Sequence, residues 1–165
     1  INPAVMREGV VVQMTWPGAP TLYYGDEAGV CGWTDPDNRR TYPWGFEDFE
    51  LIEYHRYLID LHKKLPALRR GSLKQLLADR QLIVYGRMSG ENKCAVIINN
   101  RGESRSVRVP VWELGITDED AITRMMLSDE KGYNAGRIDY RADHGWLTLD
   151  VPAHSGVLLS SGALV

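Results

Sequence analysis

The first seventy or so residues show the hydrophobic spacing of two helices with a short extended segment between them. Asn2 followed by Pro3 gives a capping residue and a proline at the first helical position, which is a common helix start. Apolar residues recur as far as Met14, and Pro17 ends the pattern. The aromatic run Pro-Thr-Leu-Tyr-Tyr at 20–24 predicts a short strand.

A second helix is predicted around residues 51–65. Its large side chains recur at spacings of three and four, which puts them on one helix face: Leu51, Tyr54, Leu58, Leu61 and Leu65. Acidic residues stand at its start and Lys63 and Lys64 near its end, as the helix dipole favours, and Pro66 limits it. A helix, a strand and a helix in this order are typical of α/β proteins.

The second half of the chain alternates with a period of two. The runs 81–88 and 93–98 are rich in β-forming residues, and Ser-Gly-Glu-Asn at 89–92 between them is typical of a hairpin turn. Five more strands are expected, around residues 106–109, 122–127, 137–140, 146–151 and 156–160. Short strands at this spacing predict an antiparallel β-sandwich. The fold class is therefore mixed, with a partial α/β domain over 1–71 and an all-β domain over 72–165.

Composition excludes several classes of protein. A chain of 165 residues with 44% hydrophobic and 25% charged residues is not disordered. Its net charge of −3, without a basic stripe, gives no case for a nucleic-acid partner. No apolar run approaches the roughly 20 residues that span a bilayer, so no membrane partner is expected. The chain starts with isoleucine and shows no signal peptide, from which we expect a truncated chain and a cytoplasmic location.

The sequence also lacks the patterns of metal and cofactor sites. Two cysteines are too few for a disulfide framework and too far apart for a zinc motif; we expect Cys94, in an apolar strand, to be buried and Cys31, in a loop, to be exposed. His55 and His62 are seven residues apart, which does not match the four-residue spacing of helical metal ligands, so we expect packing roles. No cofactor and no metal are predicted.

Two segments carry a family resemblance, Trp16–Glu27 and Asp35–Trp44. Together they resemble the alpha-amylase family of glycoside hydrolases, most of all its neopullulanase and cyclomaltodextrinase-like branch. The resemblance implies that the first segment is the eighth strand of a (β/α)8 barrel and the second the loop above it. The helix that ends in Leu-Pro-Ala-Leu-Arg-Arg-Gly at 65–71 would be the last barrel helix, and the β half would be the C-terminal sandwich.

The loop of the second segment contains the candidate substrate-binding residues Asp35, Arg39, Trp33 and Trp44. A carboxylate and a guanidinium four residues apart in a folded-back loop can bond neighbouring sugar hydroxyls, and Tyr42 with the tryptophans can stack on sugar rings. The resemblance implies that the Asp and Arg bind the glucose two places from the cleavage point on the non-reducing side. The alternative is an ion pair that only holds the loop, and the two interpretations are compatible.

No catalytic residue is predicted within the chain. Asp26 and Glu27 are adjacent, and adjacent residues leaving a strand point to opposite sides, so we expect structural roles. The resemblance implies that the three catalytic acids follow barrel strands four, five and seven, upstream of Ile1. A whole barrel takes about 250 residues. We therefore expect the C-terminal piece of a retaining α-glucan hydrolase, inactive by itself, with exposed helix faces that favour self-association.

Two other functions stay open. The β half is also interpretable as a non-catalytic carbohydrate-binding or structural module that uses Trp112 or Trp146, for which exposed aromatic rings would be the supporting observation. An accessory chain of an amino-acid transporter would need a membrane anchor, which these residues do not contain. His154 and Ser155 lack the third member of a hydrolase triad and are interpreted as turn residues.

Overall fold

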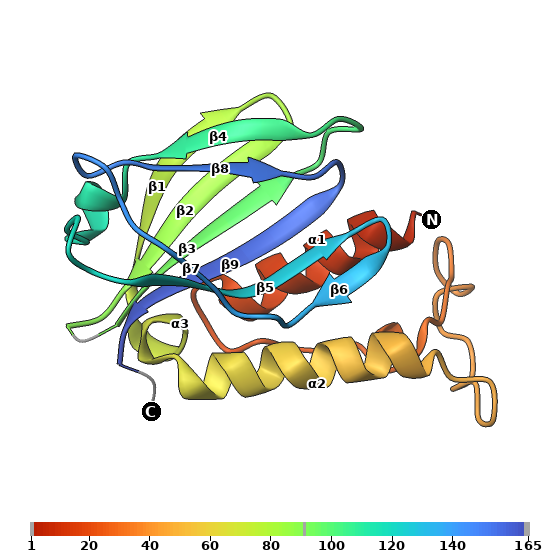
Figure 1. Ribbon diagram of the computed structural model, residues 1–165. Coiled ribbons are helices and arrows are strands. Elements are labelled where there is room, and N and C mark those ends of the chain that lie inside the picture. Colours follow the sequence, from red (N-terminus) through yellow and green to blue (C-terminus); the bar gives the residue numbers. More distant parts are fainter. Residues whose placement is uncertain (1, 91, 164–165) are drawn as a thin grey trace.

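Helices cover one face of a large β-sheet in the computed structural model, and a two-stranded sheet covers the other face (Figure 1). The structure describes residues 2–90 and 92–163. The helices are α1 (Pro3–Thr15), α2 (Phe49–Lys64) and α3 (Pro66–Arg70), with short 3-10 helices η1 (Asp26–Ala28) and η2 (Val111–Leu114). No helix in this part of the chain is long and apolar enough to span a bilayer.

The strands form two antiparallel sheets. They are β1 (Ser72–Asp79), β2 (Leu82–Met88), β3 (Asn92–Asn99), β4 (Arg105–Val109), β5 (Ile122–Asp129), β6 (Gly132–Asn134), β7 (Ile138–Tyr140), β8 (Leu147–Val151) and β9 (Ser155–Gly162). The large sheet has the order β1-β2-β3-β9-β5-β6, with β7 also paired to β5, and β4 pairs with β8 in the small sheet. The predicted antiparallel sandwich is confirmed.

The two long helices begin and end within about two residues of the predicted bounds. The Asn2 side chain accepts a hydrogen bond from the Ala4 amide at 2.9 Å and caps α1. Asp48 caps α2 in the same way, accepting from the Leu51 amide at 3.0 Å. Pro66 ends α2 and also opens α3, since proline is tolerated in a first helical turn.

The strand predicted over residues 20–24 is not formed. A strand needs a neighbour that takes up its backbone hydrogen bonds, and no described segment pairs with these residues. The chain instead crosses from α1 to η1 as an irregular segment with two half-exposed tyrosines, Tyr23 and Tyr24.

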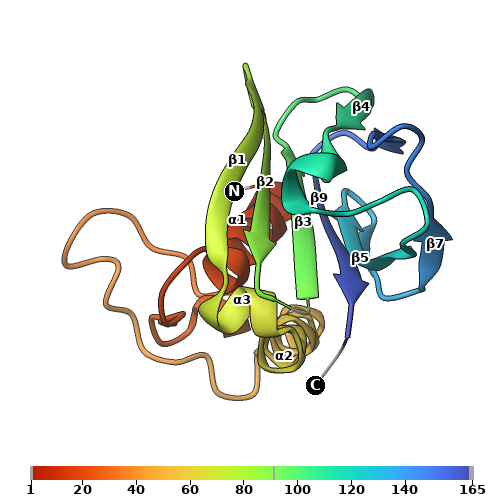
Figure 2. The ribbon, with the colours of Figure 1, turned by 90° about the vertical axis from the view of Figure 1, so that its left-hand side faces the viewer.

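Alternating side chains of the large sheet fill two separate cores. On β3, Cys94 and Val96 face the helices, whereas Ala95 and Ile97 face the small sheet. The helix-side core also contains residues from all three helices, among them Val11. Figure 2 shows the resulting layers from the side, with β4 on the opposite side of β2 and β3 from the helices. The helices and the large sheet therefore share the helix-side core. The division into domains at residue 71 stays a prediction.

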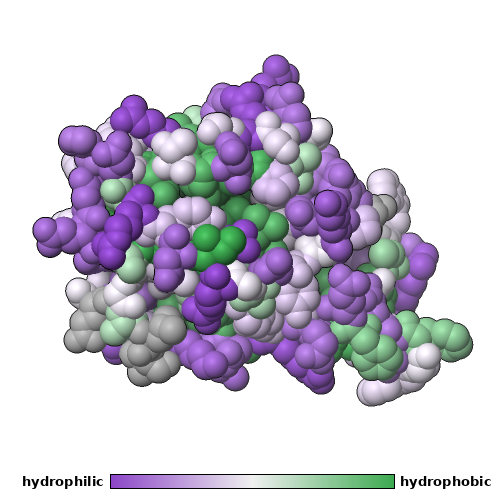
Figure 3. All heavy atoms as spheres, in the orientation of Figure 1, coloured by the Kyte–Doolittle hydropathy of each residue, from purple (hydrophilic) through white to green (hydrophobic). Residues whose placement is uncertain are grey.

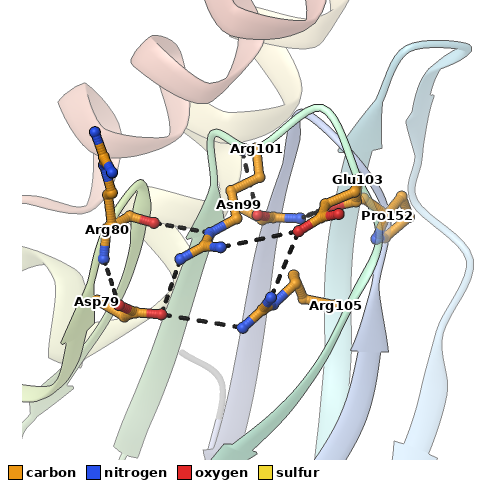
Figure 4. Close-up of polar contacts among 7 residues, drawn as sticks. All are labelled: Asp79, Arg80, Asn99, Arg101, Glu103, Arg105 and Pro152. Atoms are coloured by element: carbon orange, nitrogen blue, oxygen red, sulfur yellow. Dashed lines mark hydrogen bonds and ion pairs between the residues drawn. The ribbon is translucent and has the colours of Figure 1, made fainter.

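Polar side chains tie the layers together at one end of the sandwich (Figure 4). Asn99, at the end of β3, donates from its amide to the carbonyl oxygens of Glu103, at 3.0 Å, and Pro152, at 2.7 Å. These bonds join the large sheet to the chain segments just before β4 and just after β8, the two strands of the small sheet. Arg101 adds an ion pair with Asp79 at 2.9 Å, which holds the β1–β2 turn against the β3–β4 connection.

Candidate functional site

The predicted site residues lie on a loop, residues 30–47, that projects from the body of the molecule in both ribbon views (Figures 1 and 2). It contains no helix or strand. Its base is closed where the Asp48 amide donates to the Ala28 carbonyl at 3.1 Å. We call residues 30–47 the projecting loop.

Asp35 and Arg39 form a two-pronged ion pair at the tip of this loop. Arg39 Nε lies 2.8 Å from Asp35 Oδ1, and Arg39 Nη2 donates to Asp35 Oδ2 at 3.2 Å. The side chains remain 66% and 59% exposed, respectively. The predicted folding back of the loop is confirmed, because a Cβ on Gly32 would lie 2.6 Å from the Asn38 Cα. The pair thus presents both a hydrogen-bond acceptor and donors to solvent.

A second ion pair, which the sequence analysis did not identify, supports the first. Arg40 donates to both Asp37 carboxylate oxygens, at distances from 2.8 to 3.0 Å, and Asp37 Oδ2 also accepts from the Trp33 amide at 2.9 Å. The bonds from Arg40, and then the one from Trp33, lower the pKa of Asp37 below its ordinary value. Asp37 is therefore held as a carboxylate that fixes the Trp33 backbone beside Asp35.

Trp33 and Trp44 are among the most exposed large side chains of the molecule, at 84% and 79%. Trp44 packs against Tyr42, with ring centroids 4.6 Å apart and ring planes inclined by 50°. Figure 3 shows hydrophobic residues on the surface at this projecting end of the molecule. The structure brings Asp35 and Arg39 together. Trp33 stands two residues before Asp35 in the loop and is held through its backbone amide by Asp37, whereas Trp44 packs on Tyr42.

An open cavity of about 490 Å³ lies between the projecting loop and the first turns of α1 and α2. Tyr23, Tyr24 and Asn38 line it, and the Tyr24 hydroxyl donates to the Arg40 carbonyl at 2.9 Å. The sequence predicts a strand for both tyrosines and therefore gives no indication that they line a cavity. The only feature of the sequence that could have indicated their place in the cavity wall is their position beside a polar turn.

The two adjacent acids, Asp26 and Glu27, lie in different surroundings. Asp26 lines the cavity, where burial, and then the charge of Glu27, raise its pKa above the ordinary value. Glu27 folds back onto the Gly25 amide. Asp48, the other acid of the cavity wall, caps α2. The arrangement offers stacking faces and hydroxyl partners at the cavity.

The chain is similar over most of its length to known proteins, although no protein-family model matches it. It is 31% identical to an amylopullulanase of Thermoanaerobacterium thermosulfurigenes over 94% of the chain and 8% of that protein. It is 40% identical to neopullulanase 2 of Thermoactinomyces vulgaris over 69% of the chain and 20% of that protein. The chain thus spans between 8% and 20% of the length of these relatives.

Solved structures share the fold over nearly the whole chain. An Anoxybacillus alpha-amylase superposes with a TM-score of 0.81 at 25% identity, covering 99% of this chain and 33% of that one. The debranching enzyme of Nostoc punctiforme superposes with a TM-score of 0.75 at 30% identity, covering 96% of this chain and 31% of that one. Both the helical part and the β-sandwich therefore have counterparts in larger proteins.

Proposed function

We propose that the chain, which belongs to the alpha-amylase family of glycoside hydrolases, is the C-terminal part of a larger enzyme. That enzyme would hydrolyse α-glucosidic bonds in maltooligosaccharides, pullulan or cyclodextrins. The similarity to amylopullulanase, neopullulanase and cyclomaltodextrinase supports this substrate range. Residues 1–71 would complete a (β/α)8 barrel, and residues 72–165 would form the sandwich that covers its apolar surface.

The reaction we propose for the whole enzyme is a double displacement with retention. It needs two carboxyl groups about 5–5.5 Å apart across the scissile bond. We assign structural roles to Asp26, Glu27 and Asp48, since Glu27 accepts a hydrogen bond from the Gly25 amide and Asp48 caps α2. The catalytic acids would therefore belong to residues outside this chain, and the chain alone would release no sugar.

The exposed Asp35–Arg39 pair, with Trp33 beside it, is the observation that carries this proposal. A pyranose offers neighbouring hydroxyls that donate to a carboxylate and accept from a guanidinium, with charge-assisted bonds. A solvent-exposed ion pair contributes little to stability by itself. Redirecting some of its hydrogen bonds to a sugar therefore costs little, and Trp33 and Trp44 would limit the cleft.

The test is to extend the chain upstream through its own coding frame and assay the product. We expect the extended enzyme to release reducing sugar from pullulan, maltotriose or cyclodextrin, and the present chain to release none. Asp35→Ala or Arg39→Ala in the extended enzyme should lower kcat/KM by about 10- to 100-fold, because each removes hydrogen bonds worth about 1.5–3 kcal/mol.

Glu53→Ala is the matched control for these variants. Glu53 forms an equally exposed ion pair with Arg56 on α2, away from the loop. It should leave kcat/KM unchanged. An extended enzyme that leaves all three substrates untouched would refute the proposed function, and equal effects of the three substitutions would refute the assignment of the site.

A further inference from the structure

Trp112 stands out in the β half because this residue is 56% exposed. The other large hydrophobic residues exposed among residues 72–163 as described are aliphatic, Leu73 and Ile138. Trp112 belongs to η2, which lies at the left of Figure 1, far from the projecting loop at the right. No part of the proposed site therefore explains why this ring faces solvent.

The ring is held on a rigid support. The backbone turns tightly over residues 143–146, where the Asp143 and Trp146 amides each donate to the other's carbonyl, at 2.8 and 3.0 Å. The Trp112 amide donates to the Gly145 carbonyl at 3.0 Å. A Cβ on Gly145 would lie 2.8 Å from the Trp112 Cβ, so the side chain rests directly on the glycine backbone.

Asp118 fixes the turn from the other side. Its two carboxylate oxygens accept from the His144 amide, at 2.9 Å, and the Gly145 amide, at 2.7 Å. Because the backbone that supports Trp112 is already ordered, binding of a stacked ligand carries only a small free-energy cost for ordering the side chain.

Exposed polar side chains stand on the turn that supports the ring. The Asp143 and His144 side chains are each 93% exposed, with His144 Nδ1 2.7 Å from Asp143 Oδ1. A second indole follows at Trp146, where the Arg108 guanidinium lies 4.3 Å from the ring centroid. Aromatic rings next to a carboxylate, an imidazole and a guanidinium match a ligand that has apolar faces and a rim of hydroxyls.

We propose that the surface formed by Trp112, His144 and Trp146 binds a stretch of α-linked glucan, with a glucose ring stacked on the Trp112 indole. This inference rests on the proposed function, which names α-glucan as the substrate. A protein partner fits less well, because such interfaces bury about 800 Å² per partner around an apolar centre, and Trp112 is a single ring within a polar turn. Acidic Asp143 disfavours nucleic acid.

Two separate binding regions on one chain have a physical benefit for a polymeric substrate. Once the Trp112 surface holds one stretch of a polysaccharide, the local concentration of neighbouring stretches at the projecting loop rises, as in any bivalent interaction. A short oligosaccharide cannot reach both regions and would gain nothing. The Trp112 surface therefore concerns polymer binding rather than the chemical step.

The experiment is native electrophoresis of the chain through gels containing amylopectin, with dextran gels as the mismatched polymer, together with titration by maltoheptaose. We expect amylopectin to retard the chain and Trp112→Ala to lower the association constant at least fivefold. Trp112→Tyr, which keeps an aromatic face, should restore most of the binding. Thermal unfolding of each variant shows whether the fold is kept.

Trp33→Ala separates this inference from the proposed function. If Trp112→Ala binds as the unchanged chain does while Trp33→Ala does not, the Trp112 surface is refuted and the loop site stands. If only Trp112→Ala loses binding, the inference holds and the projecting loop does not contribute to binding by this chain. Two results would overturn the inference. Either amylopectin does not retard the chain, or Trp112→Ala changes the mass of the chain in light scattering whether or not sugar is present. The hydrolysis assay tests the proposed function independently.

Discussion

Glu8 is a buried carboxyl group at the contact of α1 with the sheet. Its Oε2 accepts from the Asn100 side-chain amide at 2.9 Å. Its Oε1 has no hydrogen-bond partner among the described residues and lies 3.9 Å from His154 Nδ1, which is likewise unpaired within the part of the chain that the structure describes. Burial is the main reason that the pKa of Glu8 rises to about 7, against the lowering effect of the Asn100 bond.

This raised pKa predicts a stability that falls as the pH rises. The folded chain keeps the Glu8 proton up to a pH of about 7, whereas the unfolded chain loses it near 4.5. The free energy of unfolding should therefore decrease between these values, by up to about 3 kcal/mol, and stay level above them. Glu8→Gln should flatten this slope in chemical denaturation at pH 5 and pH 7.5.

His154→Gln is the companion variant, because the His154 imidazole lies 3.9 Å from the same carboxylate oxygen. It should leave the downward slope in place, because that slope comes from the Glu8 proton. An unchanged slope in Glu8→Gln would show that another group causes it.

The sequence allowed prediction of residue pairs only where they are close along the chain. Asp35 and Arg39 are four residues apart, so a folded-back loop was enough to bring them together. Glu8 and Asn100 are 92 positions apart and meet only because α1 packs on the sheet. No local pattern contains that information, and the same holds for Asp118 and Gly145, which the fold brings together across 27 positions.

At the scale of elements, two glycines should respond to the same substitution with opposite signs. Gly9 lies in α1 with open space around it, so Gly9→Ala should stabilise the chain by about 0.5–1 kcal/mol through helix propensity. A Cβ on Gly71, between α3 and β1, would lie 2.3 Å from the Ala67 carbonyl oxygen and 2.6 Å from that of Met88. Gly71→Ala should destabilise by roughly 1–3 kcal/mol.

Melting temperatures of the two variants test this pair. A chain of this size shifts by about 2–4 °C per kcal/mol, so the midpoints should move apart, one up and one down. A Gly71→Ala variant as stable as the unchanged chain would mean that the α3–β1 junction rearranges freely.

Element prediction failed where the deciding contacts are distant. Residues 20–24 have strand-forming side chains, but no described neighbour pairs with them. Strand β1 was not predicted, because Leu73, Leu76 and Leu77 follow a helical spacing and the strand is largely exposed at the sheet edge. The long helices, by contrast, carry their own capping and termination signals, and the central strands carry their own alternation.

For the whole molecule, the exposed aromatic residues of the projecting loop and the start of α2 predict self-association. Trp44, Phe46 and Phe49 are all largely exposed within six residues. Exposed apolar surface of this kind favours contact between copies. Light scattering at micromolar concentration should give a mass above that of one chain. Phe46→Ser with Phe49→Ser should return the monomer mass, Trp112→Ser should not, and a monomer mass for the unchanged chain would contradict the expectation.

The position of β9 has a consequence for how the chain is made. This strand is the ninth along the sequence yet lies in the middle of the large sheet, bonded to β3 on one side and β5 on the other. Until residues 155–162 have left the ribosome, both neighbours have an open edge, and open edges recruit strands of other chains. A chain truncated before residue 155 should therefore aggregate, and the solubility of the product should show whether the large sheet is complete.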